Sequence, residues 1–158
     1  MESKTGQGQF VIRVYGILIN DNKEVLLSDE YRFNMRMTKF PGGGLKFGEG
    51  PEDCLRREAL EEFNQSAEII GHFYTTGFYQ KAMFFKNHQL ISIYYKIRLT
   101  GKPAFRISDK PFDYEEEKNG SQSFRWQKLE KLDAESLSFP IDKIVGDMLS
   151  KQYKEGML

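Results

Sequence analysis

The order of the predicted elements is characteristic of an α+β fold, an α/β/α sandwich in which helices cover a mixed β-sheet. Strands are predicted where β-branched and aromatic residues gather, over 10–20, 24–28, 67–79, 89–100 and 123–129. A helical pattern separates the early strands from the late ones at 51–63, and a second helical pattern follows them at 141–153. This sequence of strands, helix, strands and helix leads to the predicted sandwich.

The first two strands form a predicted hairpin over 10–28, because Asp21-Asn22-Lys23 is a turn signal between two strand-like runs. Residues 29–39 are mixed and mostly polar, which predicts a loop. The three glycines at 42–44 predict a break, because glycine loses much conformational freedom when it is ordered. Residues 45–47 are a candidate for a short strand.

Clear start and stop signals bound the first helix. Pro51 suits the first helical position, and Glu52 and Asp53 complement the positive end of the helix dipole. Asn64 tolerates the left-handed conformation that ends many helices. The second helix follows Pro140 and gathers its apolar residues on one face.

Length and composition predict a single soluble domain. The chain has 158 residues, of which 39% are hydrophobic, and this suits one core. Residues 1–9 are polar and are expected to form a flexible tail, so that the domain spans 10–158. The most apolar stretch, Phe10 to Ile19, is too short to span a bilayer and is interrupted by Arg13.

Charge and cysteine content restrict the expected partners. Lys+Arg and Asp+Glu both number 23, so a neutral chain gives no general electrostatic reason to bind duplex nucleic acid or an anionic membrane. A small anionic ligand at a local site remains open. The single cysteine, Cys54, excludes an internal disulfide and agrees with a reducing cytoplasm.

Carboxylates gather on one side of the first helix. Glu58, Glu61 and Glu62 are neighbours at helical spacing, where like charges repel by a few tenths of a kcal/mol per pair. A hard divalent cation with oxygen ligands, Mg²⁺ or Mn²⁺, would offset this repulsion. Arg57 lies beside the cluster and can orient a carboxylate through a bidentate pair. The alternative reading is an ordinary solvated acidic face.

Residues 43–65 resemble the Nudix box, whose pattern is G-x5-E-x7-R-E-U-x-E-E-x-G-U with U a bulky aliphatic residue. The first glycine of the pattern is matched by Gly43, and its charged positions are all matched, by Glu49, Arg57-Glu58 and Glu61-Glu62. Three positions depart from the pattern, where the chain has Ala59, Asn64 and Gln65. None of these departures removes a carboxylate.

The resemblance implies the Nudix fold and hydrolysis of a nucleoside diphosphate linked to another moiety, with Mg²⁺ or Mn²⁺ held by Glu58, Glu61 and Glu62. It implies that Glu49 supports Arg57. Gly43 and Gly44 would let the backbone and a phosphate approach closely.

The general base is less defined by the resemblance. In this family it is either a box glutamate, Glu58 or Glu61 here, or a carboxylate on a later loop. Glu116 lies in such a loop, within the acidic run 115–117. That run could equally be a solvated stretch.

Residues outside the box are candidates for substrate binding. Arg13 on the first strand could meet a phosphate, or be an ordinary surface arginine. Phe78 and Tyr79 precede the 80–88 loop, which carries Phe84 and Phe85, and aromatic residues there could stack a base. Core packing or a homodimer contact is the alternative for each of them. A nucleoside triphosphate, a nucleotide sugar and an ADP-ribose-like compound all remain open as substrates.

A second function is compatible with the same fold, namely a catalytically silent module that binds or senses a nucleotide. The intact box carboxylates argue against it, because decayed members of the family usually lose them.

Overall fold

The computed structural model describes residues 7–158, and the first six residues of the predicted tail lie outside this range. Gln9, predicted to belong to the tail, already opens the first strand. The strands and helices are β1 (Gln9–Leu18), β2 (Glu24–Arg32), β3 (Met35–Lys39), β4 (Gly42–Gly44), α1 (Pro51–Phe63), β5 (Ala67–Thr75), β6 (His88–Leu99), β7 (Ser121–Lys128) and α2 (Pro140–Lys154). Two short 3-10 helices, Leu129–Lys131 and Ala134–Ser136, connect β7 to α2.

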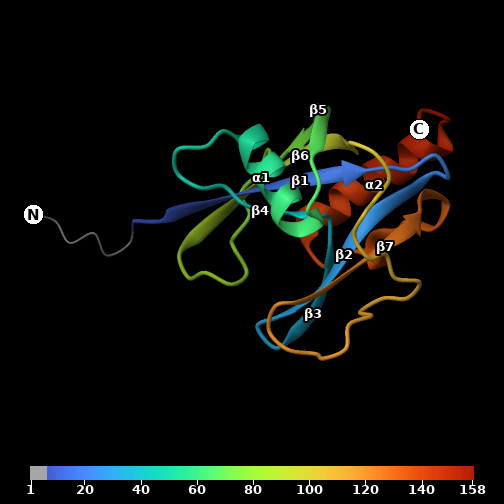
Figure 1. The fold of residues 1–158 in the computed structure, drawn as a ribbon. Coiled ribbons are helices and arrows are strands. Elements are labelled where there is room, and N and C mark those ends of the chain that lie inside the picture. The colour runs from blue at the N-terminus through green and yellow to red at the C-terminus, as the bar shows by residue number, and fades with distance from the viewer. Residues whose placement is uncertain (1–6) are drawn as a thin grey trace, which may run out of the picture.

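The predicted α+β sandwich is confirmed, but its strands divide over two sheets. The first sheet has the order β4-β1-β6-β5 and is mixed, because β1 and β6 are parallel while the other pairs are antiparallel. The second sheet, β3-β2-β7, is antiparallel throughout. Figure 1 shows β1 passing between α1 on one side and α2 on the other.

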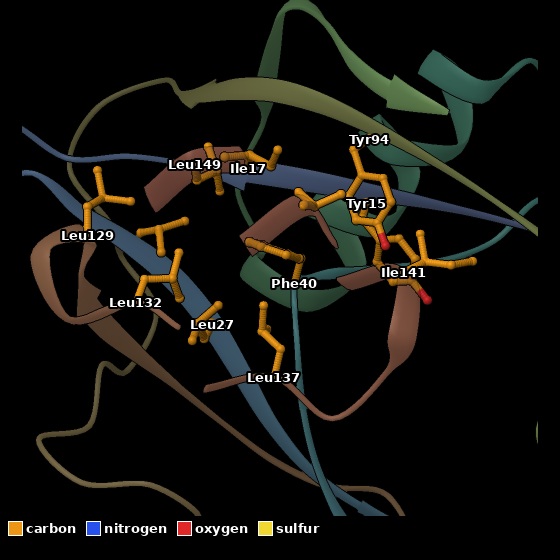
Figure 2. Close-up of a cluster of buried hydrophobic side chains, with 12 residues drawn as sticks. Tyr15, Ile17, Leu27, Phe40, Tyr94, Leu129, Leu132, Leu137, Ile141 and Leu149 are labelled. Carbon is orange, nitrogen blue, oxygen red and sulfur yellow. The ribbon is translucent and has the colours of Figure 1, made fainter. Parts of the chain in front are cut away.

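Alternation along β1 creates the two cores. Val14 and Leu18 face α1 and belong to a buried cluster that includes Leu55, whereas Tyr15 and Ile17 face α2 and pack with Leu149. Figure 2 shows the cluster on the α2 side, with side chains from the strands and the helix pointing toward one another. The two helices therefore sit on opposite faces of the first sheet.

The predicted hairpin over 10–28 is confirmed at its turn but not along its strands. An antiparallel bridge between Ile19 and Val25 and a backbone hydrogen bond from Asn20 to Glu24 close the turn, after which β2 continues into the second sheet. The reason lies in β1, whose two edges are already hydrogen-bonded, one to β4 and the other to β6. A strand with both edges occupied has no ladder left to offer β2.

The predicted loop over 29–39 is also wrong, because these residues complete β2 and form β3. Phe33 and Asn34 turn the chain between them with φ angles of 51° and 59°, as in the type I′ turns that favour hairpins. The polar residues that suggested a loop include Asp29, Glu30 and Lys39, which are buried in the sheet.

The predicted break at 42–44 is a short strand, and the predicted strand at 45–47 is not one. Gly42 pairs with Tyr15 of β1, so close that a Cβ on Gly42 would lie 2.1 Å from the carbonyl oxygen of Val14. Glycine is therefore required here for a close strand approach.

The first helix and its end are confirmed: α1 ends at Phe63, and Asn64 is left-handed with φ of 51°. The strand predicted over 67–79 ends earlier, at Thr75. Within residues 7–158, the helices are all too short or too polar to cross a membrane.

Candidate active site

The start of α1 and the strand before it place the box residues. Gly50 precedes the helix in extended conformation, and its backbone N–H donates to the carboxylate of Asp53 at 3.1 Å. Cys54, Leu55, Ala59 and Phe63 are the buried residues of α1. This burial fixes the rotation of the helix and thereby determines where the charged side chains of the box lie.

Arg57 is the centre of the box. Its guanidinium donates to the carboxylate of Glu49 through Nε and Nη2, at 3.0 and 2.7 Å, and Nη2 also donates to the carbonyl oxygen of Gly44 at 3.0 Å. Its Nη1 donates to Glu58 at 3.0 Å and to both oxygens of Glu61 at 3.3 Å. One arginine thus holds three carboxylates and the β4 backbone in a fixed arrangement.

The ion pair between Arg57 and Glu49 shifts the pKa of both groups. Hydrogen bonds from Arg57, with a further one from the backbone of Lys46, lower the pKa of Glu49 to about 2. The same hydrogen bond to Glu49 is the main reason that the pKa of Arg57 is raised. Both groups are therefore charged across the physiological range, which keeps the pair intact.

Glu58 is packed against β4. A Cβ on Gly43 would lie 2.0 Å from Oε1 of Glu58, so the absence of a side chain at Gly43 makes room for this carboxylate. Glu58 and Glu62 both line a small hollow beside Pro41 and Gly42. The spacing of the box thereby brings two carboxylates from successive turns to one place.

Glu62 lies on the side of the hollow that faces the second sheet. Burial raises its pKa to about 7, opposed by the positive charge of Lys39 and reinforced by the nearby carboxylates of Glu30 and Glu58. Its Oε1 accepts a long hydrogen bond of 3.5 Å from Nε2 of Gln122. A buried carboxylate near two others is in an environment that a bound cation would relieve.

These carboxylates fit a divalent metal by their chemistry, since Glu58 and Glu62 offer hard oxygen ligands to one hollow. In the described part of the chain, residues 7–158, no three His, Cys, Asp or Glu side chains are gathered as ligands around one point. Glu58 and Glu61 are turned to Arg57 instead, and the side chain of Glu61 is 53% exposed. Arg57 contacts Oε1 of Glu58, so Glu58 can offer Oε2 to a metal while it keeps this contact, whereas Glu61 would have to turn away from Arg57, which contacts both of its oxygens.

A cavity of about 490 Å³ lies on the other side of β1, between the sheets and the start of α2. Arg13 lines it, as do Glu30 and Lys39 from the second sheet. Phe84 stacks on Phe33 at 4.4 Å between ring centroids and meets Phe139 edge to face at 6.1 Å. The cavity therefore combines an aromatic wall with charged groups.

A short polar chain joins the cavity to the box. Nζ of Lys39 lies 3.1 Å from Oε2 of Glu30, and the same oxygen is 3.4 Å from Nε2 of Gln122, which also reaches Glu62. Burial lowers the pKa of Lys39, but Glu30 and Tyr15 outweigh this effect and the pKa is raised. Lys39 is therefore a charged ammonium at neutral pH.

Of the three residues predicted to bind substrate, the structure places one in the cavity lining and two outside it. Arg13 lines the cavity, and its Nε donates to the hydroxyl oxygen of Tyr15 at 2.7 Å. Phe78 and Tyr79 do not line it and are 44% and 69% exposed. The aromatic contact that was expected from them is supplied a few residues later by Phe84.

Glu116 is not brought to the box. Its carboxylate pairs with Lys118 at 3.4 Å, and its side chain is 71% exposed. The neighbouring Glu117 pairs with Arg36 of β3. Two of the three carboxylates of the acidic run are thus paired with basic residues near them.

Several residues of the cavity were missed by the sequence analysis, among them Glu30, Lys39, Tyr94 and Asp142. Asp142, in the first turn of α2, accepts a hydrogen bond of 2.5 Å from the hydroxyl of Tyr94. The sequence signal that could have found the charged ones is a charged residue within an otherwise apolar strand or helix face. Such residues are rarely buried without a partner, so they indicate a buried polar contact.

Comparison with known proteins gives a consistent assignment. Residues 9–147 match the family model described as the NUDIX domain. A search of curated proteins found no match. The solved structures that resemble the fold include the solution structure of the E. coli ORF135 protein, with TM-score 0.69, 14% identity and 95% of both chains covered.

Two further structures resemble this chain. A NUDIX hydrolase from Nitrosomonas europaea has TM-score 0.64 and 15% identity, with 94% of this chain and 91% of that chain covered. A MutT NUDIX hydrolase from Burkholderia pseudomallei has TM-score 0.65 and 16% identity, with 88% and 97% covered. At such identities the likeness concerns the fold.

Proposed function

Because the chain belongs to the Nudix family of pyrophosphohydrolases, whose model spans residues 9–147, we propose that it hydrolyses a pyrophosphate bond in a nucleoside diphosphate derivative with the help of Mg²⁺ or Mn²⁺. The single observation that carries the proposal is the array around Arg57. This residue holds Glu49, Glu58 and Glu61 together beside the hollow that Glu62 also lines.

The metal would be held by Glu58 and Glu62, with Glu61 either a further ligand or the general base. A divalent ion in that position neutralises diphosphate charge and lowers the pKa of a bound water. Arg57 and Glu49 serve to fix the direction of the Glu58 carboxylate, as groups behind metal ligands commonly do.

A box carboxylate is a better candidate for the general base than Glu116. Glu61 is half-exposed, and its contacts to Arg57 are the longest that this arginine makes to a carboxylate, at 3.3 Å. It is therefore free enough to turn toward a water and accept a proton. Glu116 is engaged with Lys118 on an exposed loop.

The cavity supports a nucleoside as one part of the substrate. Its volume of about 490 Å³ lies within the usual range for small-molecule sites. The pair of Phe84 and Phe33 offers a flat apolar wall, which suits a base.

A substrate panel tests this function. Purified protein with Mg²⁺ or Mn²⁺ should release phosphate or a nucleoside monophosphate from at least one nucleoside triphosphate, nucleotide sugar or ADP-ribose-like compound. Glu62→Gln should lose at least about 100-fold in kcat/KM, since it removes a ligand rather than a supporting group. Glu52→Gln is the matched control on the same helix, because Glu52 pairs only loosely with Arg56 at 3.5 Å.

Two outcomes would count against the proposal. The first is the absence of metal-dependent turnover across the panel. The second is calorimetric binding of a nucleotide that is recovered unchanged after long incubation, which would instead support the silent binding module.

A further inference from the structure

Lys39 is a buried lysine that lines the cavity. Together with Arg13, Tyr15 and Glu30 it forms the part of the lining that we call the cavity floor. The whole residue is 5% exposed, and it forms an ion pair with Glu30 in which the two side chains are 6% and 8% exposed. Burying such a pair removes two charges from water, and the desolvation cost commonly cancels the attraction between them. Stability alone is therefore a weak reason for this pair.

The ammonium of Lys39 has donor capacity to spare. Among the residues that the structure describes, its contacts are one oxygen of Glu30 and the ring of Tyr15, whose centroid lies 5.6 Å away. An ammonium carries more N–H donors than one carboxylate contact uses. Because Lys39 lines the cavity, the remaining donors are available to a ligand there.

The cavity is cationic although the chain is neutral overall. The charged residues that line it are four cations and two carboxylates, namely Arg13, Arg32, Lys39, Lys81, Glu30 and Asp142. The guanidinium of Arg13 lies over the same Tyr15 ring as the Lys39 ammonium, also at 5.6 Å from its centroid. The two cations lie near enough to interact with each other, and this local positive charge favours an anionic group in the cavity.

This floor adjoins the box. Nε2 of Gln122 reaches Glu30 at 3.4 Å and Glu62 at 3.5 Å, so a single side-chain amide separates the ion pair from the carboxylates. A diphosphate with one phosphate at the box would bring its other phosphate toward the cavity floor. Lys39 and Arg13 are the cations positioned to meet it.

We propose that Lys39, together with Arg13, forms an anion site for the phosphate on the cavity side of the substrate, and that Glu30 holds the ammonium in place when the site is empty. The proposal rests on the proposed function, since it concerns the same diphosphate. It makes Glu30 a competitor of the substrate phosphate for one ammonium. Replacing Lys39 should therefore weaken anion binding, whereas replacing Glu30 should strengthen it.

Calorimetric titration with inorganic pyrophosphate tests this directly. Lys39→Met should weaken binding by at least about 10-fold, in the range of a lost charge-assisted hydrogen bond. Glu30→Gln should strengthen binding several-fold, because the ammonium loses its competing carboxylate. Lys110→Met is the control, since Lys110 is 75% exposed and does not line the cavity.

The double variant Glu30→Gln/Lys39→Met guards against misfolding, because it leaves no buried charge without a partner. It should fold and bind pyrophosphate as weakly as Lys39→Met. A merely structural pair would behave differently: both single variants would lower the melting temperature and shift binding in the same direction, and that result would overturn the proposal.

Failure of this proposal can be distinguished from failure of the proposed function. If hydrolysis of a nucleoside diphosphate derivative is observed, and Lys39→Met leaves both its KM and pyrophosphate affinity unchanged, the anion site is refuted while the enzyme stands. If the wild-type protein binds pyrophosphate and shows the opposite effects of Lys39→Met and Glu30→Gln but cleaves nothing, the site stands and the enzymatic proposal falls.

Discussion

The guanidinium of Arg57 binds both oxygens of the Glu49 carboxylate, with Nε donating to Oε2 at 3.0 Å and Nη2 donating to Oε1 at 2.7 Å. The two residues belong to different segments, since Glu49 precedes α1 and Arg57 lies in its second turn. This pair ties the loop to the helix. It also fixes the direction from which Arg57 reaches Glu58.

Glu49→Gln should therefore reduce activity without changing the candidate metal ligands Glu58, Glu61 and Glu62. The amide keeps the shape but loses the charge and one acceptor oxygen, so Arg57 is no longer held by a bidentate pair. We expect kcat/KM to fall about 10- to 100-fold, as for other groups that orient metal ligands. Steady-state kinetics at saturating Mg²⁺ would measure the loss, and a variant that retains full activity would contradict it.

The stabilisation that the Arg57–Glu49 pair provides should depend on pH. The pKa of Glu49 is lowered to about 2 in the folded protein, so the stabilisation from the pair is present above the ordinary carboxyl pKa and is lost as pH falls toward 2. Glu49→Gln should remove that part of the acid sensitivity. Glu52→Gln, on the exposed side of α1, should not.

Gly43 and Gly42 should respond differently to alanine. At Gly43 the added Cβ would meet the end of the flexible Glu58 side chain at 2.0 Å, whereas at Gly42 it would meet the backbone oxygen of Val14 at 2.1 Å. Gly43→Ala should therefore displace a carboxylate and reduce kcat/KM about 10-fold or more, with little loss of stability. Gly42→Ala should lower the free energy of unfolding by roughly 1–3 kcal/mol.

Thermal melting and kinetics of the two variants would separate these effects. Gly71→Ala is the control, because nothing lies within 4 Å of its added Cβ. Equal losses of melting temperature in Gly43→Ala and Gly42→Ala would show that Gly43 is needed for packing rather than for the position of Glu58.

Local signals explain which parts of the fold were predictable. The helix α1 and its end at Asn64 follow from neighbouring residues alone, because capping and left-handed termination are local effects. The spacing of Arg57 and the box glutamates likewise needs only the helical repeat. These features were predicted correctly from the sequence.

Long-range pairing explains what was missed. The end of β2 and β3 looked like a loop because Asp29, Glu30 and Lys39 are charged. Each of them is nevertheless buried against a partner on a neighbouring strand. Asp29, for example, is paired with Arg125 of β7 at 2.7 Å. No pattern within 29–39 reveals a partner almost a hundred residues away, and the cavity built on these strands was hidden for the same reason.

Asp142 should give a second pH effect on stability, opposite in sign to that of Glu49. Burial raises its pKa to about 6, although the hydrogen bond from Tyr94 and the positive charges of Lys39 and Arg13 act against the shift. Between an ordinary pKa near 3.8 and this value, the folded protein holds a proton that the unfolded chain has lost. The contribution of Asp142 to stability therefore decreases as pH rises from about 4 to about 6.

Asp142→Asn should abolish this contribution, because the amide does not titrate. Urea unfolding at pH 4.5, 5.5 and 6.5 would measure it, and the stability of the wild-type protein relative to the variant should decrease as the pH is raised. Asp147→Asn is the matched control, since Asp147 lies exposed on the same helix and its replacement should leave the pH profile of the wild type intact. If the profiles of the wild type and Asp142→Asn run parallel, the buried carboxyl does not release its proton in this range.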